Sequence, residues 1–564
     1  MILNYIKDLL ALIFMVSISF LFSCKSNHNE GVKNEGGKDE VVINDGVKKD
    51  NNEIFDIQSF TKHMEILSSD EYEGRMPCSA GEDKTIAYIK EELESMKIDP
   101  GNGTSYYQDV PLIEIEGTSD SVMILDYGDR KKEVSFGKDF VIHSERNAAS
   151  VKLKDSELVF CGFGIVAPEK NWNDFEGVDL KGKTAVVLVN DPGFGGEDPT
   201  FFKGDTMTYY GRWSYKYEEA DRQGADGLLI IHEKTSAGYP WFVVQSSWTG
   251  PMQGLSGTDR SNDCGIKGWV SLNTAQDLFS DAGLDMAQEI RAARRSGFKP
   301  KSLRAKVSVN LENRFEECTS KNVVGLLKGS KRPDEYVVYT AHWDHIGIGP
   351  IVEGDSIYNG ALDNASGTAA VLEIARAFTQ QEPAPERSVI FLFVTAEEQG
   401  LWGSNHYVNN PLFPIKKTVA NINLDGVNPA GKMKDFTITG KGHSEMDDLA
   451  ALVAKTQGRY ILAGQEPEKG YFYRSDHFNF VKVGVPALYG DGGYDHWDKG
   501  KEFAKEFKEG YTAKRYHAPS DEFVASEWNY EGFLQDGQLY YEVGRLLTNS
   551  DLWPKWKKGS EFSR

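Results

Sequence analysis

The sequence predicts an α/β fold in which a mostly parallel mixed sheet is covered by helices on both faces, with a β-rich domain inserted into it. Three apolar runs of buried-strand length support this prediction, at residues 335–340, 388–395 and 419–424. Between the first two, residues 366–378 carry apolar side chains at helical spacing. Strands that alternate with helices are typical of parallel sheets that are buried on both sides.

The first 53 residues are predicted to export and tether the protein. Lys7 precedes an apolar run from Leu9 to Phe22, which is short for a membrane span and is typical of an export signal. Residues 1–24 end in Ser23-Cys24 and resemble a bacterial lipoprotein signal, in which Cys24 becomes the lipidated first residue. An ordinary signal with an incidental Cys is the alternative. Residues 25–53 are polar and are predicted to form a disordered tether. We therefore expect an exported protein, periplasmic or at the cell surface, lipid-anchored to a bacterial membrane.

The region that follows the tether begins with a predicted helix. Apolar residues recur at helical spacing over 83–96, and Pro100 and Gly101 then break the pattern. Short alternating strands such as 109–115 follow. These elements are expected to belong to the same domain as the strands beyond residue 308.

Residues 137–307 are predicted to form a small β-rich domain with a few helices. Strand-like runs occur at 158–164, 184–189 and 228–231, and a helix over 216–223 leads into the last of them. Trp, Tyr and Gly are frequent between these runs.

Four cysteines follow the tether, namely Cys78, Cys161, Cys264 and Cys318. None forms a CxxC pair, so neither a thiolate zinc site nor a redox motif is indicated. Their spacing does not define a disulfide, and we expect buried free thiols.

Composition and net charge limit the classes of molecule that the protein is expected to bind. The chain has 564 residues, of which 40% are hydrophobic and 12% aromatic, which suits a globular protein of roughly two to four domains. The net charge of -22 arises from 85 acidic and 63 basic residues. Because nucleic acids attract basic surfaces, this charge argues against nucleic acid as a partner.

Polar residues with metal-binding side chains follow the three predicted parallel strands. His342 comes directly after the first strand, Glu397 and Glu398 after the second, and Asp425 after the third. Asp363 opens the intervening helix, and His517 lies in a later loop. In open α/β sheets, sites lie beyond the carboxyl ends of the strands, so these side chains are expected to meet at one edge.

Imidazole and carboxylate ligands together suit zinc, which also needs an open position for water. Five ligands are too many for one catalytic zinc and fit two ions that share a bridging carboxylate. A separate carboxylate must then accept the proton of the attacking water, and the Glu397-Glu398 pair supplies this division because consecutive residues at a strand end point in different directions. Asp344, two residues after His342, is placed to fix the orientation of its ring.

Each candidate also has an ordinary structural interpretation. A lone His is usually structural, two adjacent glutamates are usually a solvated surface, Asp363 could cap the helix, and Asp425-Gly426 could be a turn. Their joint placement at successive strand ends favours a site. The chain has no HExxH segment, no GxSxG nucleophile elbow and no P-loop.

The chain resembles the M28 zinc peptidase family, the co-catalytic aminopeptidase group, from about residue 55 to the C-terminus. The matching segments are residues 341–347 (AHWDHIG), 360–367 (GALDNASG), 396–404 (AEEQGLWGS), 423–426 (NLDG), 474–477 (RSDH) and 516–521 (YHAPSD). The resemblance implies two zinc ions per chain and a zinc-peptidase-like (phosphorylase/hydrolase-like) fold.

The resemblance also implies a role for each residue. Asp363 bridges both ions, His342 and Asp425 complete one, and Glu398 and His517 complete the other. Glu397 is the general base, and Asp344 orients His342. A cis peptide is expected after Asp363, and Tyr516 is expected to help hold the oxyanion.

Residues 137–307 are similar to the protease-associated (PA) domain that some members of this family insert. The similar segments are 177–183 (GVDLKGK) and 220–227 (ADRQGADG). The catalytic domain would then be split into residues 54–136 and 308–564. One departure lies at Cys78 in the segment Glu73–Cys78, where relatives commonly have Gly; it lies outside the metal ligands.

From the resemblance we expect a metal-dependent exopeptidase that acts on peptides. An aminopeptidase is favoured over a carboxypeptidase because the motifs contain no pair of arginines for a terminal carboxylate, Arg474 being the one nearby candidate. The family also contains glutaminyl cyclases, and a transferrin-receptor-like binding protein is an alternative of a different class. Similar ligands can also accept manganese or cobalt. The sequence specifies neither the preferred residue nor the oligomeric state.

Overall fold

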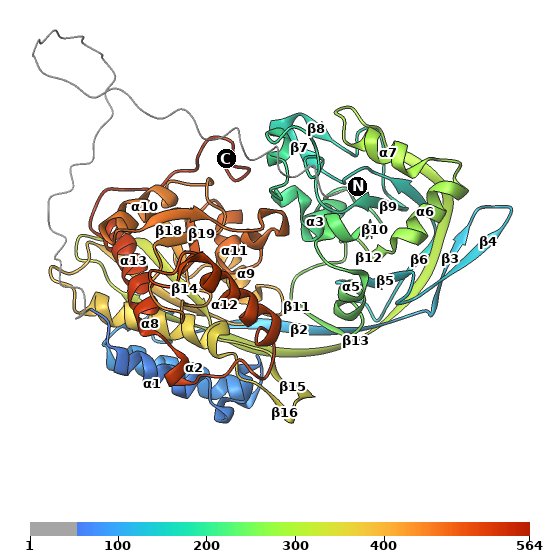
Figure 1. Cartoon of the computed structure of the whole chain (residues 1–564). Coiled ribbons are helices and arrows are strands. Elements are labelled where there is room, and N and C mark those ends of the chain that lie inside the picture. Colours follow the sequence, from blue (N-terminus) through green and yellow to red (C-terminus); the bar gives the residue numbers. More distant parts are fainter. Residues whose placement is uncertain (1–53, 564) are drawn as a thin grey trace, which may run out of the picture. The chain divides into compact units, whose positions relative to one another are not determined.

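The predicted parallel strands lie side by side in one mixed sheet of the computed structural model, which describes residues 54–563 (Figure 1). β14 (Arg332–His342) runs parallel between β17 (Arg387–Val394) and β18 (Thr418–Asn423). On the side of β18 the sheet continues through β21 (Ala487–Asp491), β19 (Asp435–Ile438) and β20 (Tyr460–Ala463), and on the side of β17 it continues to β13 (Lys301–Leu327). The predicted signal segment, Cys24 and the tether lie outside the described residues.

Helices cover both faces of this sheet, and the residues of β17 and β18 are buried at every position. In β17, Val389, Phe391 and Phe393 pack into one core, whereas Ile390 and Leu392 pack into the opposite one. The first core is covered by α1 (Ile57–Leu67), α2 (Ala80–Ser95), α8 (Ser366–Thr379), α10 (Met446–Thr456) and α13 (Tyr530–Thr548), and the second by α9 (Trp402–Asn409) and α11 (His477–Lys482). Burial of each large apolar side chain contributes roughly 1.5–3 kcal/mol. The predicted fold class is confirmed.

Residues 136–300, which precede β13, contribute a further group of strands to the same sheet. Four strands run parallel in the order β6 (Ser150–Phe160), β9 (Lys183–Leu188), β10 (Gly227–Ile231) and β12 (Ile266–Val270), and β5 (Phe140–His143) is antiparallel to β12. Helices of this region are α3 (Trp213–Arg222), α4 (Lys234–Ala237), α5 (Trp241–Ser247), α6 (Leu272–Asp281) and α7 (Met286–Ala293). The region is β-rich, as predicted, and its identification as a PA domain stays a prediction.

One long strand belongs to both regions. The first half of β13 pairs with β6 and with β3 (Val122–Asp126), which forms a hairpin with β4 (Lys131–Ser135). Its second half pairs with β2 (Tyr107–Ser119) and then with β17. The predicted boundary between residues 307 and 308 therefore lies inside a continuous strand. The other strands are β1 (Asp99–Pro100), β7 (Val166–Ala167), β8 (Trp172–Asn173), β11 (Pro251–Leu255), β15 (Gly347–Val352) and β16 (Asp355–Tyr358), and a further helix is α12 (Gly500–Lys514).

The cysteines differ from the prediction. Cys78 and Cys318 form a disulfide, whereas Cys161 and Cys264 are buried free thiols. The expectation of free thiols is thus confirmed for two cysteines and wrong for the other two. The partners are separated by 240 residues, and only the pairing of distant segments in the fold brings them together.

Removal of this disulfide should destabilise the protein. We expect the double substitution Cys78→Ser and Cys318→Ser to lower the free energy of unfolding by about 2–4 kcal/mol, because the bridge restricts the unfolded chain. Urea unfolding with and without reductant measures the effect. Reductant should shift the transition of the wild type and leave that of the double variant in place; equal shifts in both would contradict the prediction.

A buried carboxylate near the C-terminus contacts the inserted region. Glu561 accepts hydrogen bonds from Lys203 Nζ at 2.7 Å and from Tyr473 Oη at 3.1 Å. Burial alone would raise the pKa of Glu561, but the charges of His443 and Lys203 hold it at about 2. Because the pKa is lower in the folded state than the usual 4.5, the stabilisation is present above pH 4.5 and is lost as pH falls towards 2.

We expect Glu561→Gln to lower the free energy of unfolding at neutral pH by about 2 kcal/mol, as loss of a buried charged hydrogen bond does. The same substitution should flatten the dependence of stability on pH in the window from 4.5 to about 2. Urea unfolding at several pH values measures both effects, with exposed Glu316→Gln as the control. Parallel pH curves for the wild type and Glu561→Gln would contradict the assignment.

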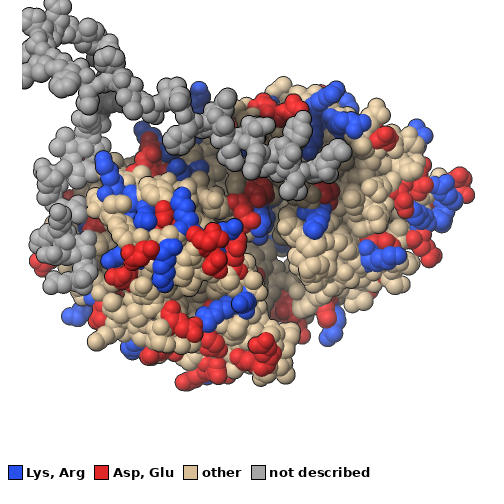
Figure 2. Space-filling model, in the orientation of Figure 1, with Lys and Arg blue, Asp and Glu red and all other residues tan. Residues whose placement is uncertain are grey.

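Two features of the surface concern possible partners. No helix among residues 54–563 is long and apolar enough to cross a membrane. On the face seen in Figure 2, Lys and Arg side chains are interspersed with Asp and Glu.

Candidate metal centre

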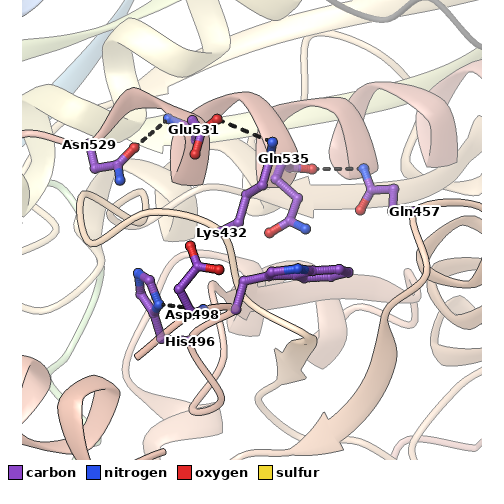
Figure 3. Close-up of a pocket in the computed structure, with 8 residues that line it drawn as sticks. Lys432, Gln457, His496, Asp498, Asn529, Glu531 and Gln535 are labelled. Atoms are coloured by element: carbon purple, nitrogen blue, oxygen red, sulfur yellow. Dashed lines mark hydrogen bonds and ion pairs between the residues drawn. The ribbon is translucent and has the colours of Figure 1, made fainter. Parts of the chain in front are cut away.

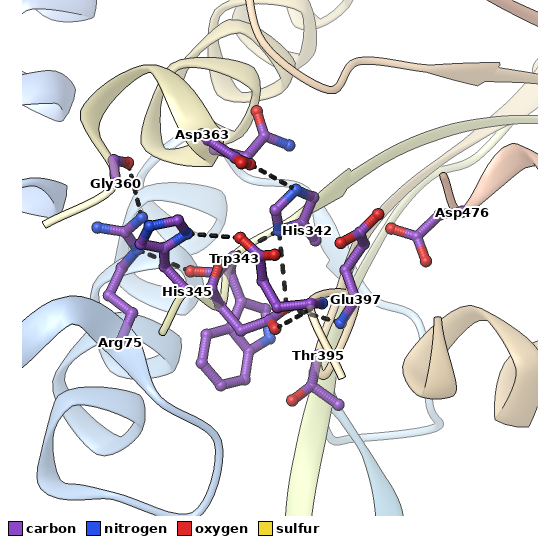
Figure 4. Close-up of polar contacts among 12 residues, drawn as sticks. Arg75, His342, Trp343, His345, Gly360, Asp363, Thr395, Glu397 and Asp476 are labelled. Carbon is purple, nitrogen blue, oxygen red and sulfur yellow. Dashed lines mark hydrogen bonds and ion pairs between the residues drawn. The ribbon is translucent and has the colours of Figure 1, made fainter. Parts of the chain in front are cut away.

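The parallel strands bring the predicted ligands to one edge of the sheet (Figure 4). His342, the last residue of β14, lies in register with Val394 at the end of β17, and Thr340 lies in register with Asn423 at the end of β18. Glu397, Glu398 and Asp425 therefore follow within a few residues of the same edge, as the sequence predicts.

The two glutamates lie in a sharp turn after β17. Ala396 has a φ of 53°, in the left-handed region that is unfavourable for a residue with a Cβ. Glu397 and Glu398 lie in this turn beyond the last strand residue. The side chains of Glu397 and Glu398 therefore point in different directions because of the turn. Alternation along a strand, which the sequence prediction invoked, does not apply to them.

Asp363 lies between two groups of potential ligands. Its Oδ1 is 3.3 Å from His342 Nε2, which is also 3.3 Å from Asp425 Oδ1. Its Oδ2 is 3.4 Å from His517 Nε2, which is 2.9 Å from Glu398 Oε2. The two carboxylate oxygens of one side chain therefore face two separate sets of ligands. The peptide bond between Asp363 and Asn364 is cis, as expected.

A second imidazole approaches Glu398. His345 Nδ1 lies 2.6 Å from Glu398 Oε1, and the ring is fully buried. Ligand atoms of His345, Asp363 and Glu398 lie within 4.8 Å of one another, as do those of His342, Asp363 and Asp425. His345 lies in the segment 341–347 (AHWDHIG), in which roles are predicted for His342 and Asp344 only. His517 is more exposed, at 37% of its side chain, and marks the side on which the centre opens.

Charges in this cluster are strongly coupled. Burial lowers the pKa of His342, but Glu397, Asp363 and Asp425 outweigh it and raise this pKa well above its ordinary value. Burial also raises the pKa of Glu397 well above its usual range. Burial opposes the shift at His517 too, yet its bonds to Asp363 and Glu398 raise its pKa to about 10. Paired imidazoles and carboxylates of this kind also bind a divalent cation.

Asp344 and Tyr516 occupy the positions predicted for supporting residues. His342 Nδ1 lies 3.1 Å from the carbonyl oxygen of Asp344 and 3.7 Å from its carboxylate. That carboxylate accepts hydrogen bonds from the backbone N–H groups of Glu397 and Glu398 at 3.2 and 3.4 Å. The ring of Tyr516 stacks on His517 with their centroids 3.9 Å apart. Both roles stay predictions.

Three residues for which the sequence predicts no role bond to the loops that carry the ligands. Asn364 Oδ1 accepts from the N–H of Gly426 at 2.8 Å and so links the bridging loop to Asp425. Asp521 accepts from the N–H of Asp363 at 3.1 Å. Asp476 faces Glu397 (Figure 4); its Oδ1 accepts from Ser404 Oγ at 2.5 Å, and its Oδ2 is buried without a partner. Asn364, Asp476 and Asp521 lie within segments that resemble the family, and this position is the sequence feature that could have identified them.

The donor set fits zinc. Imidazole nitrogens and carboxylate oxygens are zinc ligands, and the two groups of ligands share Asp363. Among residues 54–563 Glu397 has no ion pair within 4.0 Å, and burial raises its pKa, so a metal ion nearby would stabilise its charged form.

A cavity of about 500 Å³ lies elsewhere, lined by Lys432, Gln457, His496, Trp497, Asp498, Asn529, Glu531 and Gln535 (Figure 3). It contains none of the predicted ligands. Lys432 and Glu531 in its wall already pair with each other at 3.2 Å. We therefore assign the chemistry to the strand-end cluster.

Residues 322–541 match the model of Peptidase family M28. The chain is 38% identical over 137 residues to Aminopeptidase NAALADL1 of Mus musculus, covering 23% of this chain and 17% of that protein. It is 38% identical over 117 residues to Aminopeptidase YwaD of Bacillus subtilis, covering 20% and 23%. It is 26% identical over 236 residues to a probable zinc metalloprotease of Pyrenophora tritici-repentis, covering 40% and 52%. The chain thus spans from less than a fifth to about half of these relatives.

Solved structures also resemble the chain. An aminopeptidase from Aneurinibacillus sp. strain AM-1 is 19% identical with a TM-score of 0.45, covering 88% of this chain and 95% of that one. A zinc aminopeptidase from Bacillus subtilis is 19% identical with a TM-score of 0.42, covering 90% and 98%.

Proposed function

We propose that the chain is an aminopeptidase that removes N-terminal residues from peptides with two zinc ions, because residues 322–541 match the model of Peptidase family M28. His342, Asp363 and Asp425 would hold one ion, and Asp363, Glu398 and His517 the other. His345 bonds to Glu398 and would fix its orientation as an outer partner.

The observation that carries this proposal is the position of Asp363. Its Oδ1 faces His342 and its Oδ2 faces His517, so one carboxylate can bridge two ions. Paired sites of this kind place metal ions about 3.5–4 Å apart. An isolated structural ion would not need this division.

When bound, the ions would polarise the scissile carbonyl and lower the pKa of the attacking water. Glu397 belongs to neither ligand group and lies beside them, 9% exposed. It would therefore accept the proton of the attacking water and return it to the leaving amine. Tyr516, half exposed on the open side, would donate to the developing oxyanion.

One observation favours a carboxypeptidase as the second candidate. Arg212 from the inserted region packs on the 470–474 loop, its Cδ 3.3 Å from the position of a Cβ on Gly470. Arg474 donates to the carbonyl oxygen of Lys469 at 2.6 Å. Burial and the charge of Arg474 lower the pKa of Arg212 to about 10. Within residues 54–563 neither guanidinium pairs with a carboxylate, and together they would supply the arginine pair that the motifs lack.

Hydrolysis of matched peptides tests the direction. An aminopeptidase should cleave leucyl-p-nitroanilide and not its N-acetyl form, and amidation of a peptide's C-terminus should leave the rate unchanged. A chelator should abolish turnover and zinc should restore it. Cleavage that survives N-acetylation and is lost on amidation would establish the carboxypeptidase instead.

We also propose that the protein acts outside the cytoplasm, lipid-anchored through Cys24. The disulfide between Cys78 and Cys318 supports this location, because disulfides persist in oxidising compartments. Membrane fractionation of bacteria that produce the full chain or Cys24→Ser tests the anchor. The substitution should release the protein into the soluble fraction; equal membrane association would contradict the anchor.

A further inference from the structure

Arg75 is a buried arginine whose partners are all carbonyl oxygens. Its side chain is 1% exposed, and it donates to Trp343 O at 2.8 Å, Leu67 O at 2.6 Å, Asn359 O at 2.5 Å and Gly360 O at 2.9 Å. Among the described residues it has no ion pair within 4.0 Å. A planar guanidinium directs its donors in fixed directions, so these bonds fix the carbonyls relative to one another.

The carbonyls belong to the segments that carry the proposed ligands. Trp343 directly follows His342, and Gly360 lies three residues before Asp363 (Figure 4). The carbonyl oxygen of Arg75 also accepts from the backbone N–H of His345 at 3.3 Å. Arg75, which is not itself a proposed ligand, thus bonds to both of the loops that carry the ligands.

The segment that carries Arg75 has an unfavourable backbone. Glu73, Gly74 and Arg75 have φ values of 50°, 65° and 54°, three consecutive residues in the left-handed region. A Cβ on Gly74 would lie 2.5 Å from the carbonyl oxygen of Tyr358, so the segment is in close contact with β16. Strain of this kind persists only where the surroundings impose it, and it concentrates at functional sites.

The disulfide ties the same segment to the sheet. Cys78, three residues after Arg75, also has a positive φ, of 62°, and bonds to Cys318 in β13. Burial lowers the pKa of Arg75 to about 10, opposed by the charges of Asp344 and Asp363. The guanidinium therefore keeps its charge and all its donors at neutral pH.

We propose that Arg75 is a positioning residue of the metal centre. It fixes the backbones beside His342 and Asp363, so that the ligand atoms keep their spacing before metal binds. This inference rests on the proposed two-zinc function and concerns metal affinity, so its test does not require turnover. If Arg75 only stabilised the fold, its replacement would lower thermal stability and leave zinc affinity unchanged.

Arg75→Lys tests the proposal, because a lysine keeps the charge and cannot reach four carbonyls. Arg387→Lys is the matched control. Arg387 is 2% exposed, bonds to the carbonyl oxygens of Leu547 and Leu552, and begins β17 at the end of the strand away from Glu397.

Zinc affinity is measured by competition with a chelator, alongside the thermal unfolding of each zinc-free variant. Arg75→Lys should weaken zinc binding by about 10–100-fold, the cost of losing an outer partner of a metal site, whereas Arg387→Lys should change it by less than about 3-fold. Equal zinc affinity in the two variants would overturn the proposal, whatever their melting temperatures.

A second measurement applies if Arg75→Lys does not fold. Coupling between Arg75 and the metal is reciprocal, so zinc should slow the hydrogen exchange of backbone amides 73–76 in the wild type. No protection of these amides on zinc binding would overturn the proposal. A protein that binds zinc with this protection and hydrolyses no peptide would refute the proposed function and leave the role of Arg75 standing.

Discussion

Replacement of Glu397 by Gln should lower kcat by about 10²–10⁴-fold while both zinc ions stay bound. Gln has the shape of Glu and cannot accept the proton of the attacking water. Glu397 is part of neither ligand group, and the proposed ligands nearest in sequence, Glu398 and Asp425, are untouched by the change. Turnover of an aminoacyl-anilide and the zinc content of the purified variant measure the two effects.

The neighbouring glutamate provides the contrast. Glu398 lies 2.9 Å from His517 and belongs to the ligand group with Asp363, so Glu398→Gln should lose zinc as well as activity. Near-normal turnover of the Glu397→Gln variant would show that Glu397 is not the general base. A variant with depleted zinc would place Glu397 among the ligands.

Replacement of Asp363 by Ala should have the largest effect on metal content. Because its two oxygens face both ligand groups, its loss should weaken the binding of both ions. The affinity should fall by more than the roughly 10–100-fold that loss of an outer partner costs. Zinc content and turnover measure the result. Asp355→Ala is the control, since Asp355 is an exposed aspartate in β16 outside both groups. Retention of one full zinc by Asp363→Ala would show that the ions do not share this side chain.

Local patterns predicted the strands and their polar ends. Buried parallel strands need apolar residues at every position, and their carboxyl ends meet at one edge, so His342, Glu397 and Asp425 could be placed together from their sequence context alone. The helix over 366–378 followed from its periodicity and is observed as α8, Ser366–Thr379.

Long-range contacts escaped this reasoning. Arg75 acts through carbonyl oxygens, which every residue has, so no sequence pattern marks its partners. Cys78 and Cys318 meet only because the first segment packs beside β13. The charge of Arg474 acts on Arg212, which belongs to another region of the chain. The turn after β17 has a left-handed residue that is an alanine, so no glycine in the sequence marks it.

The shared strand β13 sets the order in which the chain can fold. Tyr107 and Ser119 at the ends of β2 pair with Val323 and Leu311, on the far side of the whole inserted region. A chain that emerges from its N-terminus first must hold β2 without this partner until the insertion has been made. An unpaired strand with buried apolar side chains is prone to pair with another chain, so the newly made protein should depend on a chaperone during this interval.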